Sequence, residues 1–509
     1  MDLPRRRFLY SALALGLGAS VRPRVLPAAV RKGLTPLPIP PLLEGEWRDG
    51  KRHFRLNAQA GEREFMPGKA TPTWGFNGDY LGPTLRMQRG DTVSIEVLNR
   101  LPETTTVHWH GMILPARMDG GPHQPIAPGA RWRSEYRVIQ PAATLFYHAH
   151  THGLTGPQVY RGLAGLLYID DAESAALDLP SDYGVDDIPL VIQDRDFTDD
   201  GRFRYLEFMP ERMTGKHGRS LLVNGALSPG LQARSDLLRL RLVNASNARF
   251  YRLAFSDGRR FRVIASDGGL LPEAAAVSEL VMAPAERYEI LVDLSDRKPV
   301  VLRDLGGAGN AGFGPMGMMG LDGGFDVLHI DPSAAGRSPR RPKQRLGGPD
   351  PARVEASADA RALVLEMGMM GRGMMRGGGM MGGMRRGMMG DPGGMMGGMM
   401  RINGRTFDMQ RVDFTVPANS EEVWLLGNDS PMAHPFHVHN TQFRLLTRNG
   451  RPPAAWERGY KDTVIVHPGE KLRIRVPTGP YADARHPYMF HCHILEHEDG
   501  GMMGQFTVV

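Results

Sequence analysis

Residues 237–243 read LLRLRLV and residues 92–97 read TVSIEV, so apolar and polar side chains alternate along both stretches. Successive residues of a β-strand point to opposite faces of a sheet, and such alternation is typical of a strand with one buried and one solvated face. Strands of this kind form antiparallel sheets whose apolar faces stack together. The two stretches therefore predict an all-β chain built from antiparallel β-sandwiches.

A weak internal repeat divides the chain. Asn-Gly pairs, which mark turns, occur at residues 77–78, 224–225 and 403–404, and strand-like segments after them end at Asn99, Asn244 and Asn428. A chain of 509 residues is also long enough for about three domains. We therefore expect sandwiches at residues 40–172, 186–332 and 352–509, joined by an acidic linker and a Pro-, Arg- and Gly-rich linker.

Ten of the 17 histidines lie in four short clusters that also contain the only cysteine. The clusters read HWH at 108–110, HAH at 148–150, HPFHVH at 434–439 and HCHILEH at 491–497, with Met502 close behind. Imidazole binds several transition metals, but one cysteine, two histidines and a weak axial methionine are the ligands of a blue-copper electron-transfer centre. The clusters predict a site for several copper ions.

The spacing of these histidines predicts where they point. In a strand, residues i and i+2 face the same side, so each His-x-His pair can direct two imidazoles into one cavity. Cys492 must then face away from His491 and His493. A thiolate on one face and two imidazoles on the other would give electrons a short covalent path between two metal sites.

The motifs HWHG, HAHTHG, HPFHVH and HCHILEHEDGGMM resemble, in order and composition, the copper signatures of the multicopper oxidases, and the resemblance runs from Asn77 to Val509. It implies three cupredoxin-like Greek-key domains, of which the middle one has no copper ligands, and four copper ions. Matched by position, it implies a type 1 site at His434, Cys492, His497 and Met502, a type 2 site at His108 and His437, and a type 3 pair at His110, His148, His150, His439, His491 and His493.

The resemblance also implies the reaction. Small reductants each give one electron at the type 1 site, the electrons pass along Cys492 to His491 and His493, and four of them reduce O2 to water. This reduction needs four protons, so carboxyl groups must lie near the imidazoles. Asp119 and Glu498 match the residues to which the family assigns proton delivery; the alternatives are a turn residue for Asp119 and a surface charge for Glu498.

Residues 367–400 contain fourteen methionines and fourteen glycines, with only Arg, Asp and Pro besides. This composition favours neither a helix nor a strand, and we expect a mobile insertion in the third domain. Thioethers are soft ligands that prefer Cu(I), which suggests capture of that ion. A flexible linker or an adaptable apolar surface are the alternatives, and the arginines of the segment would repel a cation.

Methionine-rich inserts at this place resemble those of the periplasmic cuprous oxidases, in which Met and Asp side chains hold a substrate copper beside the type 1 site. Met432 matches one such ligand, whereas Ser430 stands where the family has Asp, so Asp429 becomes the candidate. We therefore expect oxidation of Cu(I) to Cu(II), and less specifically of phenols and aromatic amines, in copper tolerance. The alternatives are a general phenol-oxidising laccase and a non-catalytic copper store; a two-domain nitrite reductase would lack the third repeat.

Residues 1–29 resemble a twin-arginine signal peptide, with Arg5, Arg6 and Arg7 before an uncharged stretch too short to span a bilayer. We expect recognition by the twin-arginine export machinery, cleavage near Ala28 or Ala29, and a monomeric enzyme in a bacterial periplasm; a retained membrane anchor is the alternative. A lone cysteine in an exported protein fits a buried metal ligand. The net charge of +7 is dispersed and no nucleic-acid motif accompanies it, so we expect no nucleic-acid partner.

Overall fold

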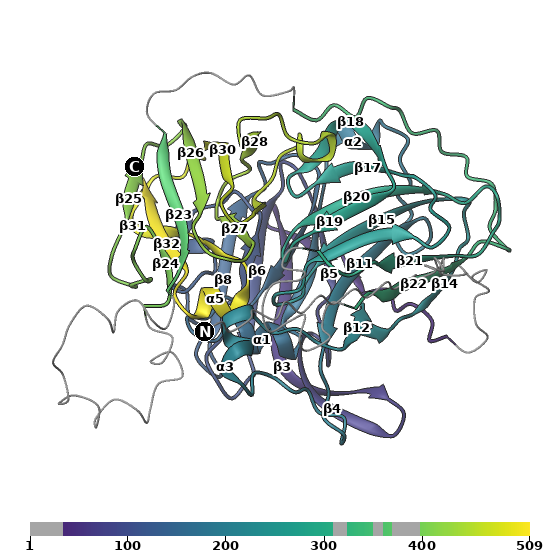
Figure 1. Ribbon diagram of the computed structural model, residues 1–509, viewed down its shortest axis with the longest axis horizontal. Coiled ribbons are helices and arrows are strands. Elements are labelled where there is room, and N and C mark those ends of the chain that lie inside the picture. Colours follow the sequence, from purple (N-terminus) through teal and green to yellow (C-terminus); the bar gives the residue numbers. More distant parts are fainter. Residues whose placement is uncertain (1–33, 309–322, 350–359, 369–397) are drawn as a thin grey trace, which may run out of the picture.

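The computed structural model describes residues 34–308, 323–349, 360–368 and 398–509. The expected signal peptide and most of the methionine-rich segment lie outside the described residues. Six β-sheets pair into three sandwiches, which confirms the all-β, cupredoxin-like fold (Figure 1). Within the described residues, no helix is long and apolar enough to cross a membrane.

The first sandwich contains two five-stranded sheets around a core that includes Trp109, Leu145 and Val97. One sheet has the order β1 (Leu42–Leu43), β5 (Thr84–Gln88), β10 (Ala164–Asp170), β9 (Ala143–His148) and β7 (His108–His110). The other has the order β2 (Glu46–Arg48), β3 (Lys51–Met66), β6 (Thr92–Asn99) and β8 (Arg131–Arg137), with β4 (Lys69–Phe76) paired to β3.

The second sandwich is the teal part of Figure 1. Its larger sheet has the order β13 (Ala226–Leu227), β12 (Ser220–Val223), β11 (Asp187–Arg195), β15 (Leu237–Asn244), β20 (Arg287–Asp293), β17 (Phe261–Ser266) and β18 (Gly269–Val277). Its smaller sheet has the order β14 (Gly230–Gln232), β22 (Phe325–Asp331), β21 (Val300–Asp304), β16 (Tyr251–Phe255) and β19 (Glu279–Met282).

The third sandwich, green to yellow in Figure 1, has one sheet in the order β24 (Met400–Ile402), β23 (Arg361–Met367), β26 (Glu421–Asn428), β30 (Lys471–Pro477) and β28 (Arg444–Arg448). The other has the order β25 (Phe414–Val416), β32 (Met503–Val508), β31 (Asp483–Cys492), β27 (His434–Val438) and β29 (Thr463–Val466). The described residues also contain the short α-helices α1 (Thr155–Arg161), α2 (Ala172–Ala175), α3 (Met209–Thr214) and α5 (Leu495–Asp499).

Two details of the strand predictions are wrong. The sheets are mixed, because β3 pairs with β6, β11 with β15, and β23 with β26 in parallel. The polar face of residues 237–243 is not solvated either: Arg239 and Arg241 are buried where the first two sandwiches meet, and they form ion pairs with Glu289. A second domain covers the face that alternation alone assigns to water.

The internal repeat is repeated in the hydrogen bonds of its turns. Asn77, Asn224 and Asn403 each have a positive φ, between 51° and 56°. Each side chain accepts a hydrogen bond from a backbone N–H of a neighbouring strand and donates one to the carbonyl two residues before that N–H. The N–H donors are Asn57, Val191 and Val364, and the carbonyl acceptors are Arg55, Pro189 and Ala362, respectively. Asn tolerates this left-handed conformation better than other side chains do, which explains the residue type.

The strand-terminal asparagines of the repeat are equivalent in the same way. The amides of Asn99, Asn244 and Asn428 each donate to two carbonyl oxygens and accept from the backbone N–H two residues later. In the third sandwich the acceptors are Met432 and Val466 and the donor is Ser430. The loop that leads to His434 is therefore fixed by this asparagine.

The ends of the methionine-rich segment belong to the sheet. Met367 and Met400 pair across β23 and β24, and Met400 is fully buried in the core of the third sandwich. The backbone N–H of Gly368 donates to the carbonyl of Met399, 2.7 Å away. The expectation of a mobile insertion without strands over residues 367–400 is wrong at these ends, because strand pairing overrides the local composition.

Replacing Asn224 by alanine should destabilise the protein by about 1–3 kcal/mol, because a buried N–H and a buried carbonyl lose their partner and alanine resists a positive φ. Urea unfolding of the wild type, Asn224→Ala and Asn224→Gly would measure the change. Glycine removes the hydrogen bonds but not the freedom to adopt positive φ, so it should cost less than alanine. Equal stability of all three proteins would contradict the structural role given to this turn.

Candidate metal centre

Three side chains of the third sandwich form a compact triangle. Nδ1 of His434 lies 3.3 Å from Sγ of Cys492, Nδ1 of His497 lies 3.6 Å from that sulfur, and the two nitrogens are 3.3 Å apart. All three residues are buried, and so is Met502, whose carbonyl accepts from the backbone N–H of Cys492. β27, β31 and α5 bring together three of the four residues that the sequence predicts for the type 1 site, and Met502 is buried in the same core cluster.

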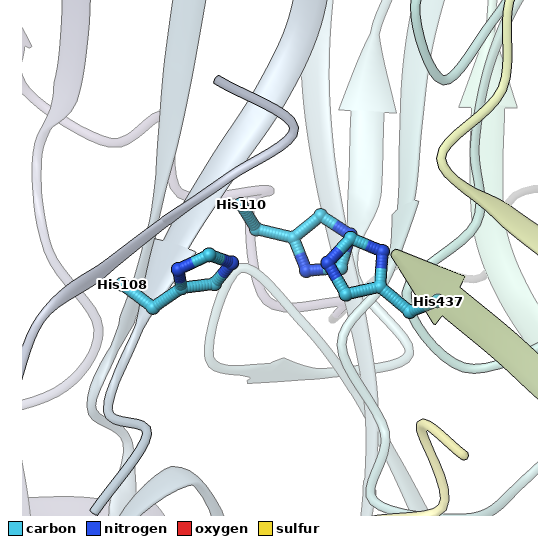
Figure 2. A group of neighbouring side chains, drawn as sticks. All are labelled: His108, His110 and His437. Atoms are coloured by element: carbon cyan, nitrogen blue, oxygen red, sulfur yellow. The ribbon is translucent and has the colours of Figure 1, made fainter. Parts of the chain in front are cut away.

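A second group lies where the first and third sandwiches meet. It contains the eight remaining histidines of the four clusters, all buried. Their ring nitrogens form three sets within 4.8 Å of one another: His108, His110 and His437; His110, His148 and His493; and His150, His439 and His491. Figure 2 shows the first set, in which the rings of His110 and His437 are stacked with centroids 3.7 Å apart and His108 faces them. The structure therefore brings together every predicted type 2 and type 3 residue.

The strand alternation at the end of β31 connects the two groups. His491 and His493 belong to two of the histidine sets, whereas the sulfur of Cys492 belongs to the triangle. His491 and Cys492 end β31, where consecutive side chains point to opposite faces, and His493 follows directly, so only backbone separates the thiol from the two imidazoles. The predicted division of these three residues between two sites matches the geometry.

Most of the rings in the histidine group hold one nitrogen toward a protein acceptor. Nδ1 of His108, His148, His437 and His491 lies 2.8–3.1 Å from a backbone carbonyl. Nδ1 of His439 lies 2.7 Å from Oδ2 of Asp119, and Nε2 of His110 lies 3.0 Å from Oδ1 of Asp462. A ring that donates from one nitrogen offers a lone pair on the other, which is the arrangement that metal-binding histidines adopt.

The inward-facing nitrogens test whether the group fits a metal. Nε2 of His108, Nε2 of His437 and both ring nitrogens of His493 are buried without a hydrogen-bond partner. Buried polar atoms of this kind cost free energy unless something satisfies them, and they need an explanation when they gather in one place. Metal ions bound by the imidazoles would satisfy them, so the residues present fit copper.

Burial also keeps these imidazoles uncharged. It lowers the pKa of His148 to about 3 and that of His497 to about 4, and it lowers the pKa values of His110 and His493 further below their ordinary range. A neutral imidazole is the form that binds a metal, so no proton has to leave these rings near pH 7. Burial raises the pKa of the Cys492 thiol, so a nearby cation is needed to stabilise the thiolate.

Two buried carboxyl groups touch the outer nitrogens of the histidine group. Asp119 contacts His439, and Glu498 lies 3.3 Å from Nδ1 of His150 and 3.2 Å from Nδ1 of His491. Burial raises the pKa of both carboxyls. Glu498 is therefore no surface charge, which removes the alternative considered for it from the sequence.

The surroundings of the triangle include contacts that the sequence did not reveal. Oγ of Ser430 lies 2.6 Å from Nε2 of His434, and the carbonyl of Met213 in α3 lies 3.0 Å from Nε2 of His497. Met432 is buried in the same core cluster as Cys492, whereas Asp429 is exposed. A backbone carbonyl leaves no signal in a sequence, although the departure at Ser430 did mark the position where the contact forms.

Sequence profiles of the multicopper oxidases match residues 57–174 and 383–509. A multicopper oxidase of Staphylococcus haemolyticus is 37% identical to this chain over 90% of the chain and 89% of its own length. This chain belongs to the multicopper oxidase family, in which copper is the bound metal.

Other relatives and structures are similar over nearly the whole chain. The cell division protein FtsP of Escherichia coli is 36% identical, covering 100% of this chain and 99% of its own. The laccase-like multicopper oxidase CueO of Ochrobactrum sp. is 36% identical with a TM-score of 0.80, covering 93% of this chain and all of its own. A metallo-oxidase of Campylobacter jejuni is 28% identical with a TM-score of 0.77, covering 94% and 98%.

The metal-free protein should lose stability as the pH falls below about 6.5, because its buried histidines have folded-state pKa values below those of the unfolded chain. The unfolded state then binds more protons. His148 alone should cost about 1.4 kcal/mol between pH 7.5 and 5.5. The measurement is urea unfolding of the metal-free wild type and His148→Gln at both pH values. Buried carboxyls with a raised pKa gain stability as the pH falls, so the test is the difference in pH dependence between the wild type and His148→Gln. An identical pH dependence of the two proteins would contradict the prediction.

Proposed function

We propose that this chain oxidises Cu(I) to Cu(II), and less specifically phenols and aromatic amines, with four-electron reduction of O2 to water. The observation that supports an oxidase most strongly is the division of His491, Cys492 and His493 between the triangle and the histidine group. A protein that only stores copper has no need to join two sites through one strand. The role belongs to copper tolerance in the periplasm, after export by the twin-arginine route.

In this proposal four copper ions occupy the two groups. His434, Cys492, His497 and Met502 would hold the type 1 ion, His108 and His437 the type 2 ion, and the six other histidines the type 3 pair. Copper at these positions supplies one-electron oxidation of the reductant and a place where O2 is reduced. The chain contributes the spacing: Cys492 and its two neighbours connect the sites through a backbone path of one residue on either side.

Asp119 and Glu498 would deliver the protons that water formation requires. Each carboxyl contacts an imidazole on the side turned away from the centre of the group, and each pKa is raised by burial. A carboxyl that keeps its proton nearer to neutral pH is a better acid than an ordinary surface carboxylate. Glu498 also accepts a hydrogen bond from the hydroxyl of Thr155, 2.7 Å away, which orients it.

Thioethers that pack against the core of the third sandwich support Cu(I) as the reductant. Met209, Met213, Met367 and Met399 are partly buried and pack against the core cluster that contains Cys492 and Met432. Sulfur of this kind binds Cu(I) in preference to harder ions. Ser430 is occupied by its contact with His434, so the exposed carboxylate of Asp429 stays our candidate for the second type of ligand.

A second candidate function comes from the similarity to FtsP over the whole chain. A role in cell division would need the fold but no electron transfer. The intact triangle and histidine group favour the oxidase, because unpartnered imidazole nitrogens are costly to retain without a metal. Copper analysis and O2 uptake by the purified protein on addition of Cu(I) distinguish the two functions.

Cys492→Ser should remove the thiolate-to-copper absorption in the visible spectrum, because an alcohol is a poor copper ligand. Oxidation of Cu(I) and of a phenol should fall to the background rate, since the path between the two sites begins at this sulfur. Absorption spectra and O2-electrode measurements on the copper-loaded proteins check both effects. A variant that stays blue, or that still consumes O2 with either reductant, would exclude the assignment of Cys492.

Removing residues 369–397 should separate the two substrate classes. The 2.7 Å hydrogen bond between Gly368 and Met399 shows that a short Gly-Ser connection can join the ends. Cu(I) oxidation should lose efficiency through a higher KM, whereas phenol oxidation should be unchanged or faster. Asp429→Ala in the full-length protein should likewise raise the KM for Cu(I) and leave phenol oxidation unchanged, because its carboxylate is our candidate for the second type of ligand. Unchanged Cu(I) kinetics in the shortened protein would show that the methionines are not a capture device.

A further inference from the structure

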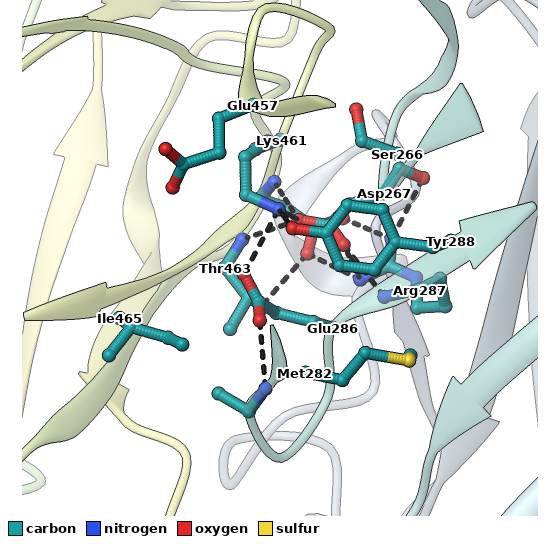
Figure 3. Close-up of polar contacts among 12 residues, drawn as sticks. Ser266, Asp267, Met282, Glu286, Arg287, Tyr288, Glu457, Lys461, Thr463 and Ile465 are labelled. Atoms are coloured by element: carbon teal, nitrogen blue, oxygen red, sulfur yellow. Dashed lines mark hydrogen bonds and ion pairs between the residues drawn. The ribbon is translucent and has the colours of Figure 1, made fainter. Parts of the chain in front are cut away.

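Arg287 lies where all three sandwiches meet (Figure 3). It begins β20 of the middle sandwich and is fully buried. Its Nε donates to the carbonyl of Thr144 in the first sandwich, and its two Nη atoms donate to the carbonyls of Ala285 and Asp267. The same Nη atoms form a bidentate pair with the carboxylate of Asp462 in the third sandwich, at 2.6 and 2.5 Å. All five guanidinium donors are therefore used.

Asp462 also contacts the histidine group. Its Oδ1 lies 3.0 Å from Nε2 of His110, and its backbone carbonyl lies 2.8 Å from Nδ1 of His437. These two nitrogens are the outer ones of rings that belong to different sandwiches. Because a carboxylate only accepts, the hydrogen of His110 stays on Nε2 and the lone pair of Nδ1 faces the other imidazoles, 3.3 Å from Nε2 of His148.

The middle sandwich also fixes the backbone that carries Asp462. Nζ of Lys461 lies 3.0 Å from Asp267 and 3.1 Å from Glu286, and Figure 3 shows these groups gathered around it. Oδ2 of Asp267 accepts from the backbone N–H groups of Asp462 and Thr463. The segment 461–463 is thus held on its side chains and on its backbone by a domain that supplies no histidine to the group.

An ordinary buried ion pair would explain a contact between Arg287 and Asp462, but it would not explain the geometry beyond it. A lone carboxylate can rotate about its last bond, whereas a planar bidentate fork fixes the carboxylate plane. That plane decides whether Oδ1 reaches His110. The partners of metal-binding histidines fix ring orientation in this way, and their loss typically weakens metal binding by about 10–100-fold.

We propose that Arg287 is a positioning residue for the trinuclear copper site: by orienting Asp462 it holds His110 with Nδ1 toward the other ligands. The ligand-free middle sandwich thereby sets the copper affinity of a site built from the other two. This inference rests on the proposed function, because it takes the histidine group as the trinuclear site.

The test compares Arg287→Gln with Arg241→Gln. Arg241 is equally buried, forms a bidentate pair with Asp187, and also bridges to Thr144 of the first sandwich, so it is matched in burial, charge and interface. Copper-loaded proteins are dialysed against increasing EDTA. Type 1 copper is followed by its visible band, type 2 copper by electron paramagnetic resonance, and type 3 copper as the remainder of the total copper measured by atomic absorption. Arg287→Gln should lose type 2 and type 3 copper at about 10–100-fold lower EDTA than the wild type and keep the blue band. Arg241→Gln should keep all copper.

Equal copper loss in both variants, or none in Arg287→Gln, would overturn the proposal. Arg287→Lys keeps the charge but not the fork, so it should fall between the wild type and the glutamine variant, and it serves if Arg287→Gln does not fold. A further readout needs no copper: in metal-free protein with 15N-labelled histidine, nuclear magnetic resonance should show His110 protonated on Nε2 in the wild type and a mixture of tautomers in the Arg287 variants. A single tautomer in all proteins contradicts the inference, and this result is independent of whether the protein is an oxidase.

Discussion

The structure depends on burying uncharged imidazoles side by side. Eight buried rings from two sandwiches converge, and their inner nitrogens lie close to one another. The lone pairs of neighbouring rings repel one another and have lost their hydrogen bonds to water. Contact between these two domain surfaces therefore costs free energy in the metal-free protein. A bound cation would make the same contact favourable, because each inner lone pair could then bind the metal. The interface between the first and last sandwiches and the occupancy of the centre are thus two aspects of one equilibrium.

The middle sandwich explains how such an interface is kept in register. It contributes no imidazole, yet its arginines reach into both neighbours: Arg241 toward the first sandwich and Arg287 toward the first and third. The carbonyl of Met213 in α3 also lies 3.0 Å from Nε2 of His497 in the third sandwich. Buried ion pairs contribute little net stability, but they tolerate only one geometry. This strict geometry, rather than added stability, fixes the relative position of the two domains that supply the ligands.

Strand period and local turn chemistry are the features that the sequence predicts well. His-x-His pairs and the single Cys between two histidines determine their own faces, and Asn-Gly turns determine three equivalent corners, because both depend on neighbours in the chain. Contacts between distant segments left no such trace. Arg239 and Arg241 read as solvated because alternation cannot show that another domain covers them, and Met400 read as part of a loop because its composition hides its strand partner. The carbonyl of Met213 and the carboxylate of Asp462 act through positions that only the fold brings together.

The hydrogen-bonded ends of the hairpin formed by β23 and β24 have an evolutionary consequence. Since Met367 and Met400 are paired in the sheet, any sequence that joins them begins and ends at neighbouring positions. The length of that sequence therefore has little effect on the structure around the triangle. The entropy of closing a loop grows slowly, by about 0.6 kcal/mol for each doubling. A sequence inserted between these two strands can therefore be lengthened, shortened or exchanged during evolution at little cost to the sheet that carries it.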